Sequence, residues 1–255
     1  SAATRYDMVL FIQVHHMSHA NMARLREVQP QARFVLYNWD SLTTHDYRPY
    51  ERFFDRVLTF DPDDAQSAGV TYLPLFAIPA FYAVDRSRPK DIDLYFVGAI
   101  GSLARFEALE KLHAFCEQQG LVTHFHLKCS PAVRLMLKRK GKSLPGITGE
   151  SLPFEKIIDL IERSRGTFDF ANHAQSGYTM RLIENMAAGV KVVTEKKRIA
   201  SEDFYRDDRF LVVKNHDLSG VPEFLATPIT SELDVERFSV DNWARQLLGS
   251  VGEEG

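Results

Sequence analysis

Short hydrophobic runs alternate with longer stretches of mixed apolar and polar residues along most of this chain. The runs at 8–13 (MVLFIQ), 34–37 and 57–60 are continuous, as expected of strands buried on both faces of a sheet. Ser18 precedes a stretch with helical spacing that continues to about Val28, and a short fourth strand is expected at 71–75. Strands that alternate with helices predict parallel sheets with right-handed crossovers.

The same alternation starts again after residues 78–90, whose prolines and charged residues are typical of a linker. The expected elements that follow are a strand at 93–97, a turn at 98–101, a helix at 102–119, a strand at 123–128, a helix at 131–140, a short strand near Ile147, a helix at 153–163, a strand at 167–170, a helix from 178–179 and a strand at 191–194.

These elements predict an α/β protein with two Rossmann-like lobes, one formed by residues 1–85 and the other by residues 86–255. The first lobe is short, because a complete Rossmann-like lobe takes about 120 residues or more. We expect the N-terminal lobe to be truncated; a naturally compact lobe is the alternative.

The most informative segment is 164–198, where an apolar strand, a polar loop and a helix follow one another. Gly177, Thr179 and Arg181 come where the strand has ended and the helix begins. Backbone N–H groups and the helix dipole favour phosphate at such a position. Glu184, one turn further on, adds a carboxylate for sugar or ribose hydroxyls. The segment therefore predicts a nucleotide-sugar site.

The segment GYTMRLIENMAAGVKVVT resembles the donor-binding segment of GT-B-fold glycosyltransferases. It is most similar to a bacterial lipopolysaccharide and capsule biosynthesis group related to CgeB-like proteins. LYNWDS, FDRVLTFDPDDA, VTYLPLF and DLYFVGAIGSLAR occur in the matching order, so the resemblance extends from about Tyr6 to Val213.

The resemblance implies a GT-B enzyme that transfers a sugar from a nucleotide-sugar donor to a surface polysaccharide or related glycan. The first lobe would be the acceptor side and the second the donor side. Together with the positions at strand and helix ends, it gives these expected donor-binding residues: Gly98, Lys128, Gly177, Tyr178, Thr179, Arg181 and Glu184.

Two of these positions can be weighed further. A cation in the first turn of a helix opposes the helix dipole, which favours a ligand-binding role for Arg181 over a surface role. Many retaining GT-B enzymes carry two glutamates eight positions apart, and the second corresponds to Glu184. The first falls at Ser176, which has no carboxylate, so the stereochemical outcome stays open.

A catalytic base is expected from the first lobe. Asp40 lies just past a buried strand, and His16 follows the strand at 8–13. Either side chain could take a proton from an acceptor hydroxyl, as inverting chemistry requires. The alternatives are that Asp40 caps the next segment with Ser41 and that His16 is structural.

Residues 61–64 (DPDD) are typical of a helix N-terminus rather than a metal site. We therefore expect no metal, and no cofactor beyond the nucleotide-sugar substrate.

Composition limits the partners and the compartment. The formal net charge of −3 does not favour nucleic-acid binding. Cys116 and Cys129 are expected as buried free thiols of a cytoplasmic protein, and no apolar run approaches the roughly 20 residues of a membrane span. Residues 133–142 are basic on one side and apolar on the other. They form a solvated helix face or make peripheral contact with the inner face of the membrane, where a lipid-linked acceptor would lie.

Two other functions compete with sugar transfer. The chain could be a non-catalytic module, derived from a GT-B enzyme, that binds a nucleotide-sugar or a partner. Ser176 and the short first lobe favour this interpretation. A sugar-nucleotide epimerase of related shape is the third hypothesis.

Overall fold

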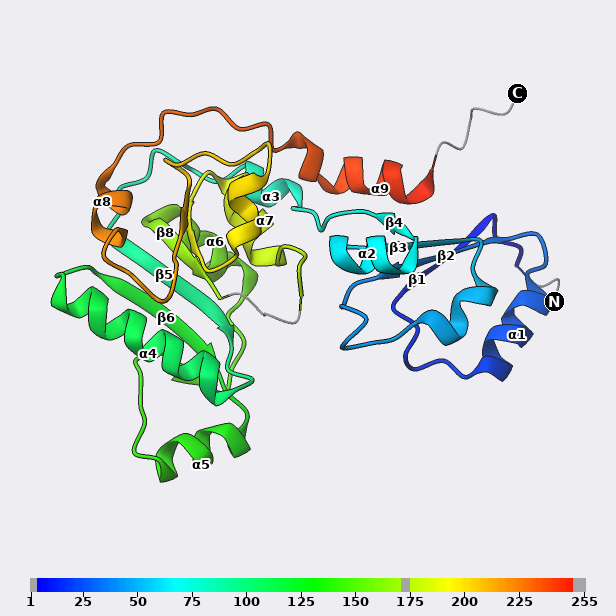
Figure 1. Cartoon of the computed structure of the whole chain (residues 1–255), viewed down its shortest axis with the longest axis horizontal. Helices are drawn as coiled ribbons and strands as arrows, with labels where there is room; N and C mark the ends of the chain where they lie inside the picture. The colour runs from blue at the N-terminus through cyan, green and yellow to red at the C-terminus, as the bar shows by residue number, and fades with distance from the viewer. Residues whose placement is uncertain (1–3, 171–174, 250–255) are drawn as a thin grey trace. The chain divides into compact units, whose positions relative to one another are not determined.

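The computed structural model describes residues 4–170 and 175–249, which form two compact units (Figure 1). The first unit contains residues 4–76, 175–180 and 236–249, and the second contains residues 77–170 and 181–235. The boundary predicted at residue 85 treats each lobe as one continuous range. In the structure, each unit is assembled from separate ranges.

The first unit is built on a four-stranded parallel sheet in the order β1-β2-β3-β4. Its strands are Met8–Ile12, Arg33–Asn38, Arg56–Thr59 and Thr71–Tyr72, close to the runs that the hydrophobic pattern predicts. Each strand is added beside the previous one, so the strand order in this sheet never reverses.

Helices cover both faces of this sheet. They are α1 (His19–Val28), η1 (Arg48–Phe53), α2 (Pro62–Ala68), and η3 (Glu236–Phe238) with α9 (Val240–Leu248) from the C-terminal segment. Phe34 and Leu36 pack on one face with Met22 of α1. Tyr37 points to the other face, where its ring centroid lies 5.0 Å from that of Trp243 of α9. This alternation along β2 explains why residues 34–37 are all apolar.

The second unit contains a six-stranded parallel sheet in the order β10-β9-β8-β5-β6-β7. The strands are β5 (Ile92–Ala99), β6 (Thr123–Lys128), β7 (Ile147–Thr148), β8 (Ser164–Asp169), β9 (Lys191–Thr194) and β10 (Phe210–Val212). The chain adds β6 and β7 on one side of β5, and then crosses back to place β8 on the other side. The strand order therefore reverses between β5 and β8.

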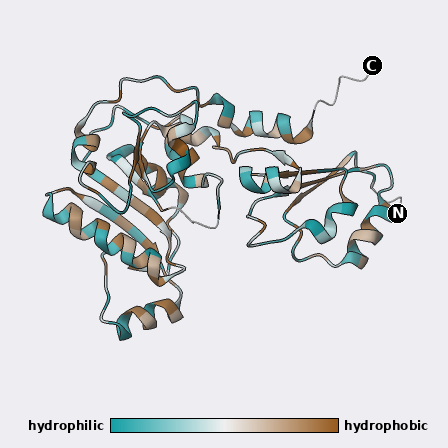
Figure 2. Cartoon of the chain, in the orientation of Figure 1, coloured by the Kyte–Doolittle hydropathy of each residue, from teal (hydrophilic) through white to brown (hydrophobic). Residues whose placement is uncertain are grey.

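Its helices are α3 (Pro79–Tyr82), α4 (Leu103–Gln118), α5 (Pro131–Arg139), α6 (Phe154–Arg163), α7 (Met180–Ala188), η2 (Lys197–Ser201) and α8 (Val221–Ala226). Leu94 and Phe96 of β5 share a core with Phe106 of α4, whereas Tyr95 between them faces α7. Figure 2 shows α4 alternating between hydrophobic and hydrophilic residues, as a helix with one buried face does.

Some elements differ from the sequence prediction. The predicted linker 78–90 contains the short helix α3, which Pro79 begins because proline suits the first helical position. Strand β10 and helices α8 and α9 follow Thr194 and were not predicted. The predicted free thiols are confirmed, with Cys116 and Cys129 both buried. In the ranges 4–170 and 175–249, no helix is both long enough and apolar enough to cross a membrane.

Candidate functional site

The carboxyl ends of β5 and β8 mark the point where the strand order of the second sheet reverses. Open α/β sheets bind ligands outside the carboxyl ends of their strands at such a point. Gly98 is the last residue but one of β5, and Asp169 ends β8. A Cβ built on Gly98 would lie 3.0 Å from the Phe96 ring, so a larger residue there would crowd the end of the strand.

Arg105 of α4 lies at this edge of the sheet. Its Nη1 donates to the carbonyl of Ala99 (2.9 Å), and its guanidinium carbon lies 5.3 Å from the centre of the Phe170 ring. Burial lowers the pKa of Arg105, and the Asp169 carboxylate partly opposes that shift. Its Nε is buried and has no hydrogen-bond partner among the described residues.

Asp169 is 3% exposed and accepts a hydrogen bond from Thr194 Oγ1 (3.1 Å), at the end of β9. Neither residue was predicted for the site. Their positions at the ends of adjacent strands are the signal that could have identified them.

Lys128 ends β6, one strand from the reversal, where it pairs in register with Ala99 of β5. Its side chain is exposed, and its Nζ donates to Ser151 Oγ (2.7 Å). The structure therefore brings Gly98 and Lys128 to the same edge of the sheet, as their positions in the sequence predict.

Arg181 and Glu184 lie together in the first two turns of α7. Arg181 Nη1 is 3.3 Å from Glu184 Oε2, and the two side chains are 26% and 15% exposed. Arg181 Nε is buried without a hydrogen-bond partner among the described residues. Burial raises the pKa of Glu184, and the nearby Arg181 partly opposes that shift. The pair is thus a half-buried cation and carboxylate with unused hydrogen-bonding capacity.

A buried hydrogen-bond network lies beneath this pair and connects α7 to β5. Tyr95 Oη donates to Asn185 Oδ1 (2.7 Å), and Asn185 Nδ2 donates to the carbonyl of Arg181 (2.8 Å). Burial raises the pKa of Tyr95 to about 12, so its hydroxyl stays protonated as a donor. The network joins the sheet to the first turn of α7, at Arg181.

The loop that leads into α7 is anchored to Asp61 of the first unit. Asp61 is 2% exposed and accepts hydrogen bonds from the backbone N–H groups of Ser176 (2.6 Å) and Gly177 (3.2 Å). Ser176 Oγ also donates to Asp61. A Cβ built on Gly177 would lie only 2.5 Å from the carbonyl oxygen of Phe60, so the close approach requires glycine.

Asp61 is also the N-cap of α2, as predicted, because it accepts from the backbone N–H groups of Asp63 and Asp64. Burial raises the pKa of Asp61, but the hydrogen bonds that it accepts outweigh that effect and lower it. Of the predicted loop residues, Tyr178 is buried and Thr179 is half-buried, and residues 171–174 lie outside the described part.

The predicted catalytic residues both follow strands of the first sheet. Asp40 accepts a hydrogen bond from Gln13 Nε2, and its Oδ2 lies 3.7 Å from His45 Nε2. The His45 ring stacks on His15 at 4.0 Å, and the exposed ring of His16 lies 3.9 Å from that of His15. Asp40 and His16 therefore belong to one polar cluster.

His45 was missed by sequence reasoning, since no spacing pattern singles it out. In the structure it is the histidine paired with Asp40. Local desolvation lowers the pKa of His15, and His16 and His45 lower it further while Asp40 raises it. A neutral imidazole of this cluster could accept a proton near neutral pH.

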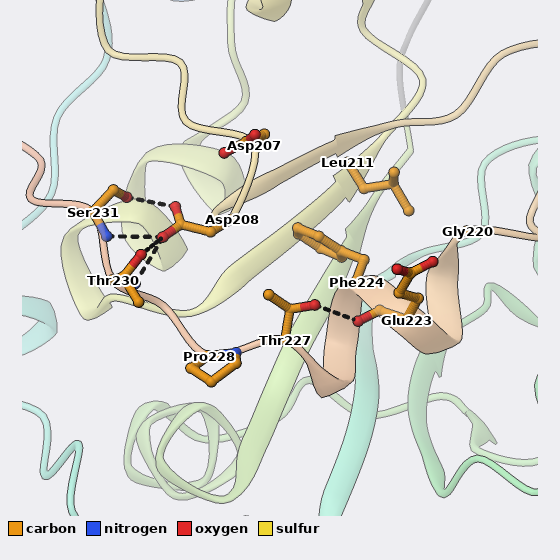
Figure 3. Close-up of a pocket in the computed structure, with 10 residues that line it drawn as sticks. All are labelled: Asp207, Asp208, Leu211, Gly220, Glu223, Phe224, Thr227, Pro228, Thr230 and Ser231. Atoms are coloured by element: carbon orange, nitrogen blue, oxygen red, sulfur yellow. Dashed lines mark hydrogen bonds between the residues drawn. The ribbon is translucent and has the colours of Figure 1, made fainter.

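One pocket of the second unit has a volume of about 600 Å³ and contains none of the predicted site residues (Figure 3). Asp207, Asp208 and Glu223 line it, and Asp208 accepts hydrogen bonds from Thr230 and Ser231. Three carboxylates repel a diphosphate, so this pocket is unsuited to a nucleotide-sugar.

No group of three or more His, Cys, Asp or Glu side chains suited to holding a metal ion occurs among residues 4–170 and 175–249.

No family model and no curated protein sequence matches the chain. Solved structures resemble it over most of its length. An α-glucosyltransferase in complex with UDP and a 13-mer DNA aligns with a TM-score of 0.61 at 15% identity, over 95% of this chain and 74% of that chain. The lipopolysaccharide outer core galactosyltransferase WaaB in its apo form gives 0.54 at 13% identity, over 93% and 72% of the two chains. AviGT4, a glycosyltransferase involved in avilamycin A biosynthesis, gives 0.54 at 15% identity, over 96% and 75%.

At these identities the likeness concerns the fold alone. The chain has the two-unit α/β fold of the GT-B glycosyltransferases, as the sequence predicts. Its resemblance to the CgeB-like group stays a prediction.

Proposed function

We propose that this protein is a glycosyltransferase that transfers a sugar from a nucleotide-sugar donor to a surface polysaccharide or related glycan. The observation that carries the proposal is Arg181. It is a half-buried cation in the first turn of α7, where the helix dipole disfavours positive charge. Its neighbour Glu184 shares this desolvated position, and one nitrogen of Arg181 is left without a partner. An anionic ligand would offset the cost of a cation at the helix N-terminus and accept a hydrogen bond from the nitrogen of Arg181 that has no partner.

The chemistry follows from the groups at the end of the second sheet. The Arg181 guanidinium and the α7 backbone N–H groups would neutralise the diphosphate leaving group as the glycosidic bond breaks. Glu184 would accept hydrogen bonds from sugar or ribose hydroxyls, and Gly98 would leave room for the donor. Lys128 would supply a second cation. Because these residues provide the positive charge, we propose that transfer needs neither a metal nor a cofactor.

The candidate proton acceptors are Asp40 and His16, to which the structure adds His45. A carboxylate that pairs with an imidazole fixes its orientation, as Asp40 would do for His45. The proton would pass from the acceptor hydroxyl to this cluster while the sugar is transferred. The rate should then fall as acid protonates the cluster.

The likeness to structures described as glycosyltransferases, one in complex with UDP, supports the donor class. The glycan acceptor and a cytoplasmic location rest on the sequence resemblance. A lipid-linked acceptor reached through peripheral membrane contact at 133–142 is a further part of the proposal. In α5 the residues Val133, Met136 and Leu137 pack on the protein core, which leaves Leu135 (50% exposed) as the large apolar contact. Liposome co-sedimentation with charge reversal at Lys138 and Arg139 tests that contact.

Isothermal titration with a panel of nucleoside diphosphates tests the donor site. We expect one of them to bind, and Arg181→Ala to weaken its binding by about 1.5–3 kcal/mol, because a hydrogen bond to a charged group is lost. Arg24→Ala is the matched control: Arg24 also pairs with a glutamate three residues on, at 3.1 Å, but is 74% exposed. Binding of none of the diphosphates by the folded protein would refute the proposal.

A non-catalytic donor-binding module is the second candidate. The observation that favours it is Ser176. This residue has no carboxylate to present to a ligand, and its hydroxyl and backbone N–H both donate to Asp61. Donor binding without sugar transfer or donor hydrolysis would select this function over the enzyme.

A further inference from the structure

A second pocket of the second unit lies at the opposite end of the sheet from the proposed donor residues. It has a volume of about 380 Å³, within the lower range for small-molecule sites. Its walls come from the segments that precede β5 and β10, from the first residues of β8 and β9, and from the end of α7. The polar residues among them are Arg86, Lys90, Ser164, Arg165, Lys191 and Arg209.

Five of these six residues are cations, and the lining contains no carboxylate. Arg86 donates to the carbonyl of Ala187 (2.9 Å) and Lys90 to that of Glu162 (2.5 Å). Lys191 donates to the carbonyls of Phe224 and Thr227, and Arg209 to that of Ser231.

A carbonyl oxygen accepts a hydrogen bond but does not neutralise a full positive charge. Only Arg165 has an ion-pair partner among the described residues, Asp93 at 3.1 Å. The Asp208 carboxylate attracts Lys191 and Arg209, and Glu162 and Asp85 attract Lys90, but none of these three carboxylates lines the pocket. Positive charge is therefore in excess around this cavity.

Ser164 is an independent sign of a missing ligand. It is the first residue of β8, lines the pocket and is 1% exposed, yet its Oγ has no hydrogen-bond partner among the described residues. A buried hydroxyl without a partner costs about 1–3 kcal/mol. A ligand oxygen in the pocket would remove that cost.

Structural roles explain individual cations but not the cluster. Arg86 stabilises the negative end of the α7 dipole, and Lys191 satisfies carbonyls at the end of α8. Neither role requires Arg209 and Lys90 to face the same cavity. Burial lowers the pKa of Arg209, the nearby Asp208 opposes that shift, and the cations Arg86 and Arg206 lower it further.

We propose that this pocket binds a small phosphate-bearing anion, such as a phosphate ester or a free diphosphate. The guanidinium groups of Arg86 and Arg209 would hold the phosphate oxygens, and Ser164 would donate its hydroxyl. The site is distinct from the proposed donor site. Arg181 is the second residue of α7 and Gly189 follows the end of the helix, so about 12 Å of helix separates the two positions.

Isothermal titration of inorganic pyrophosphate, at constant ionic strength in sodium chloride, tests this site. The titration uses Arg181→Ala as the background, so that binding at the proposed donor site is weakened. We expect pyrophosphate to bind this background protein. Adding Arg86→Gln should weaken binding about tenfold or more, since one charge-assisted contact is lost.

Ser164→Ala is the second variant, and it removes no hydrogen bond among residues 4–170 and 175–249. It should leave the thermal unfolding temperature without ligand unchanged or slightly higher, and weaken pyrophosphate binding several-fold. Arg88→Gln is the matched control. Arg88 lies two residues from Arg86 but pairs with Asp159 and Glu162 and does not line the pocket. Adding Arg88→Gln should leave the affinity for pyrophosphate equal to that of the Arg181→Ala protein.

Absence of pyrophosphate binding in the Arg181→Ala background would overturn the proposal. So would an affinity that Arg86→Gln and Ser164→Ala leave unchanged. If Arg86→Gln does not fold, Ser164→Ala alone decides, because the Ser164 hydroxyl makes no hydrogen bond to any described residue.

Discussion

Replacing Asp61 tests the most heavily hydrogen-bonded side chain near the loop that leads into α7. Its carboxylate accepts from the backbone N–H groups of Asp63, Asp64, Ser176 and Gly177, and from the Ser176 hydroxyl. At 2% exposure, water cannot replace these contacts. Asp61→Ala should therefore leave several buried donors without an acceptor.

The expected loss of stability is the sum of two contributions, from the contacts of Asp61 with α2 and from its contacts with the loop at 176–177. Removal of the α2 cap costs about 1 kcal/mol. Two loop N–H groups left without an acceptor add roughly 1–2 kcal/mol each, so Asp61→Ala should lower the free energy of unfolding by about 3–5 kcal/mol. Asp61→Asn keeps one acceptor oxygen and should cost about half as much. Losses of this size are a large part of a total stability of about 5–15 kcal/mol.

Urea denaturation followed by circular dichroism measures these changes. Asp46→Ala is the control, because that exposed carboxylate binds only Arg48 and should contribute no more than about 0.5 kcal/mol. A loss below about 1 kcal/mol for Asp61→Ala would show that only the helix cap matters, and would refute the role of Asp61 as the anchor of the loop.

Three further predictions concern the same region. Gly177→Ala should lower the free energy of unfolding by about 1–3 kcal/mol, because the added Cβ would clash with Phe60. Gly101→Ala is the control and should be neutral, since no atom lies within 4 Å of its added Cβ. Equal denaturation midpoints for the two variants would contradict this. Glu184→Gln should leave the free energy of unfolding at pH 7 unchanged or raise it by up to about 1 kcal/mol, because burial raises the pKa of Glu184 and so disfavours its charged form. Donor affinity, measured by calorimetry, should fall. A loss of stability would contradict this prediction and mean that the pair of Glu184 with Arg181 is net stabilising. The lowered pKa of Asp61 stabilises the folded protein at neutral pH, and this stability is lost as pH falls below about 4 through the folded pKa. The free energy of unfolding of Asp61→Asn should therefore fall less steeply in acid than that of the wild type. Urea titrations at successive pH values measure this.

Elements with a strong local pattern could be predicted from the sequence. The apolar runs at 8–12 and 34–37 are strands, as predicted. Only the run at 34–37 is buried on both faces; the prediction that both faces of 8–13 are buried is wrong, because Leu10 and Ile12 of the edge strand β1 are 39% and 45% exposed. Ser18 and Asp61 cap helices as their residue types indicate. The region after Thr194 was not predicted, because β10 has three residues and α8 has six, too few for a period to be recognised.

The candidate site was also predictable only in part from the sequence. Gly98 and Lys128 could be placed at the end of the sheet, because the carboxyl ends of parallel strands share one edge. Contacts between distant positions could not be predicted. Asp61 and Ser176 are 115 positions apart, and the pairing of His45 with Asp40 depends on how an irregular segment folds back.

The return of residues 236–249 to the first unit has a consequence for the order of folding during synthesis. Trp243 packs against Tyr37 and Phe76, and the carbonyls at the end of α9 accept hydrogen bonds from Arg33 and Arg56. A ribosome releases these residues only after the whole of 77–235 has emerged. The unit that starts first is thus finished last, and its exposed β2 surface must wait for α9 before it is shielded from water and from other chains.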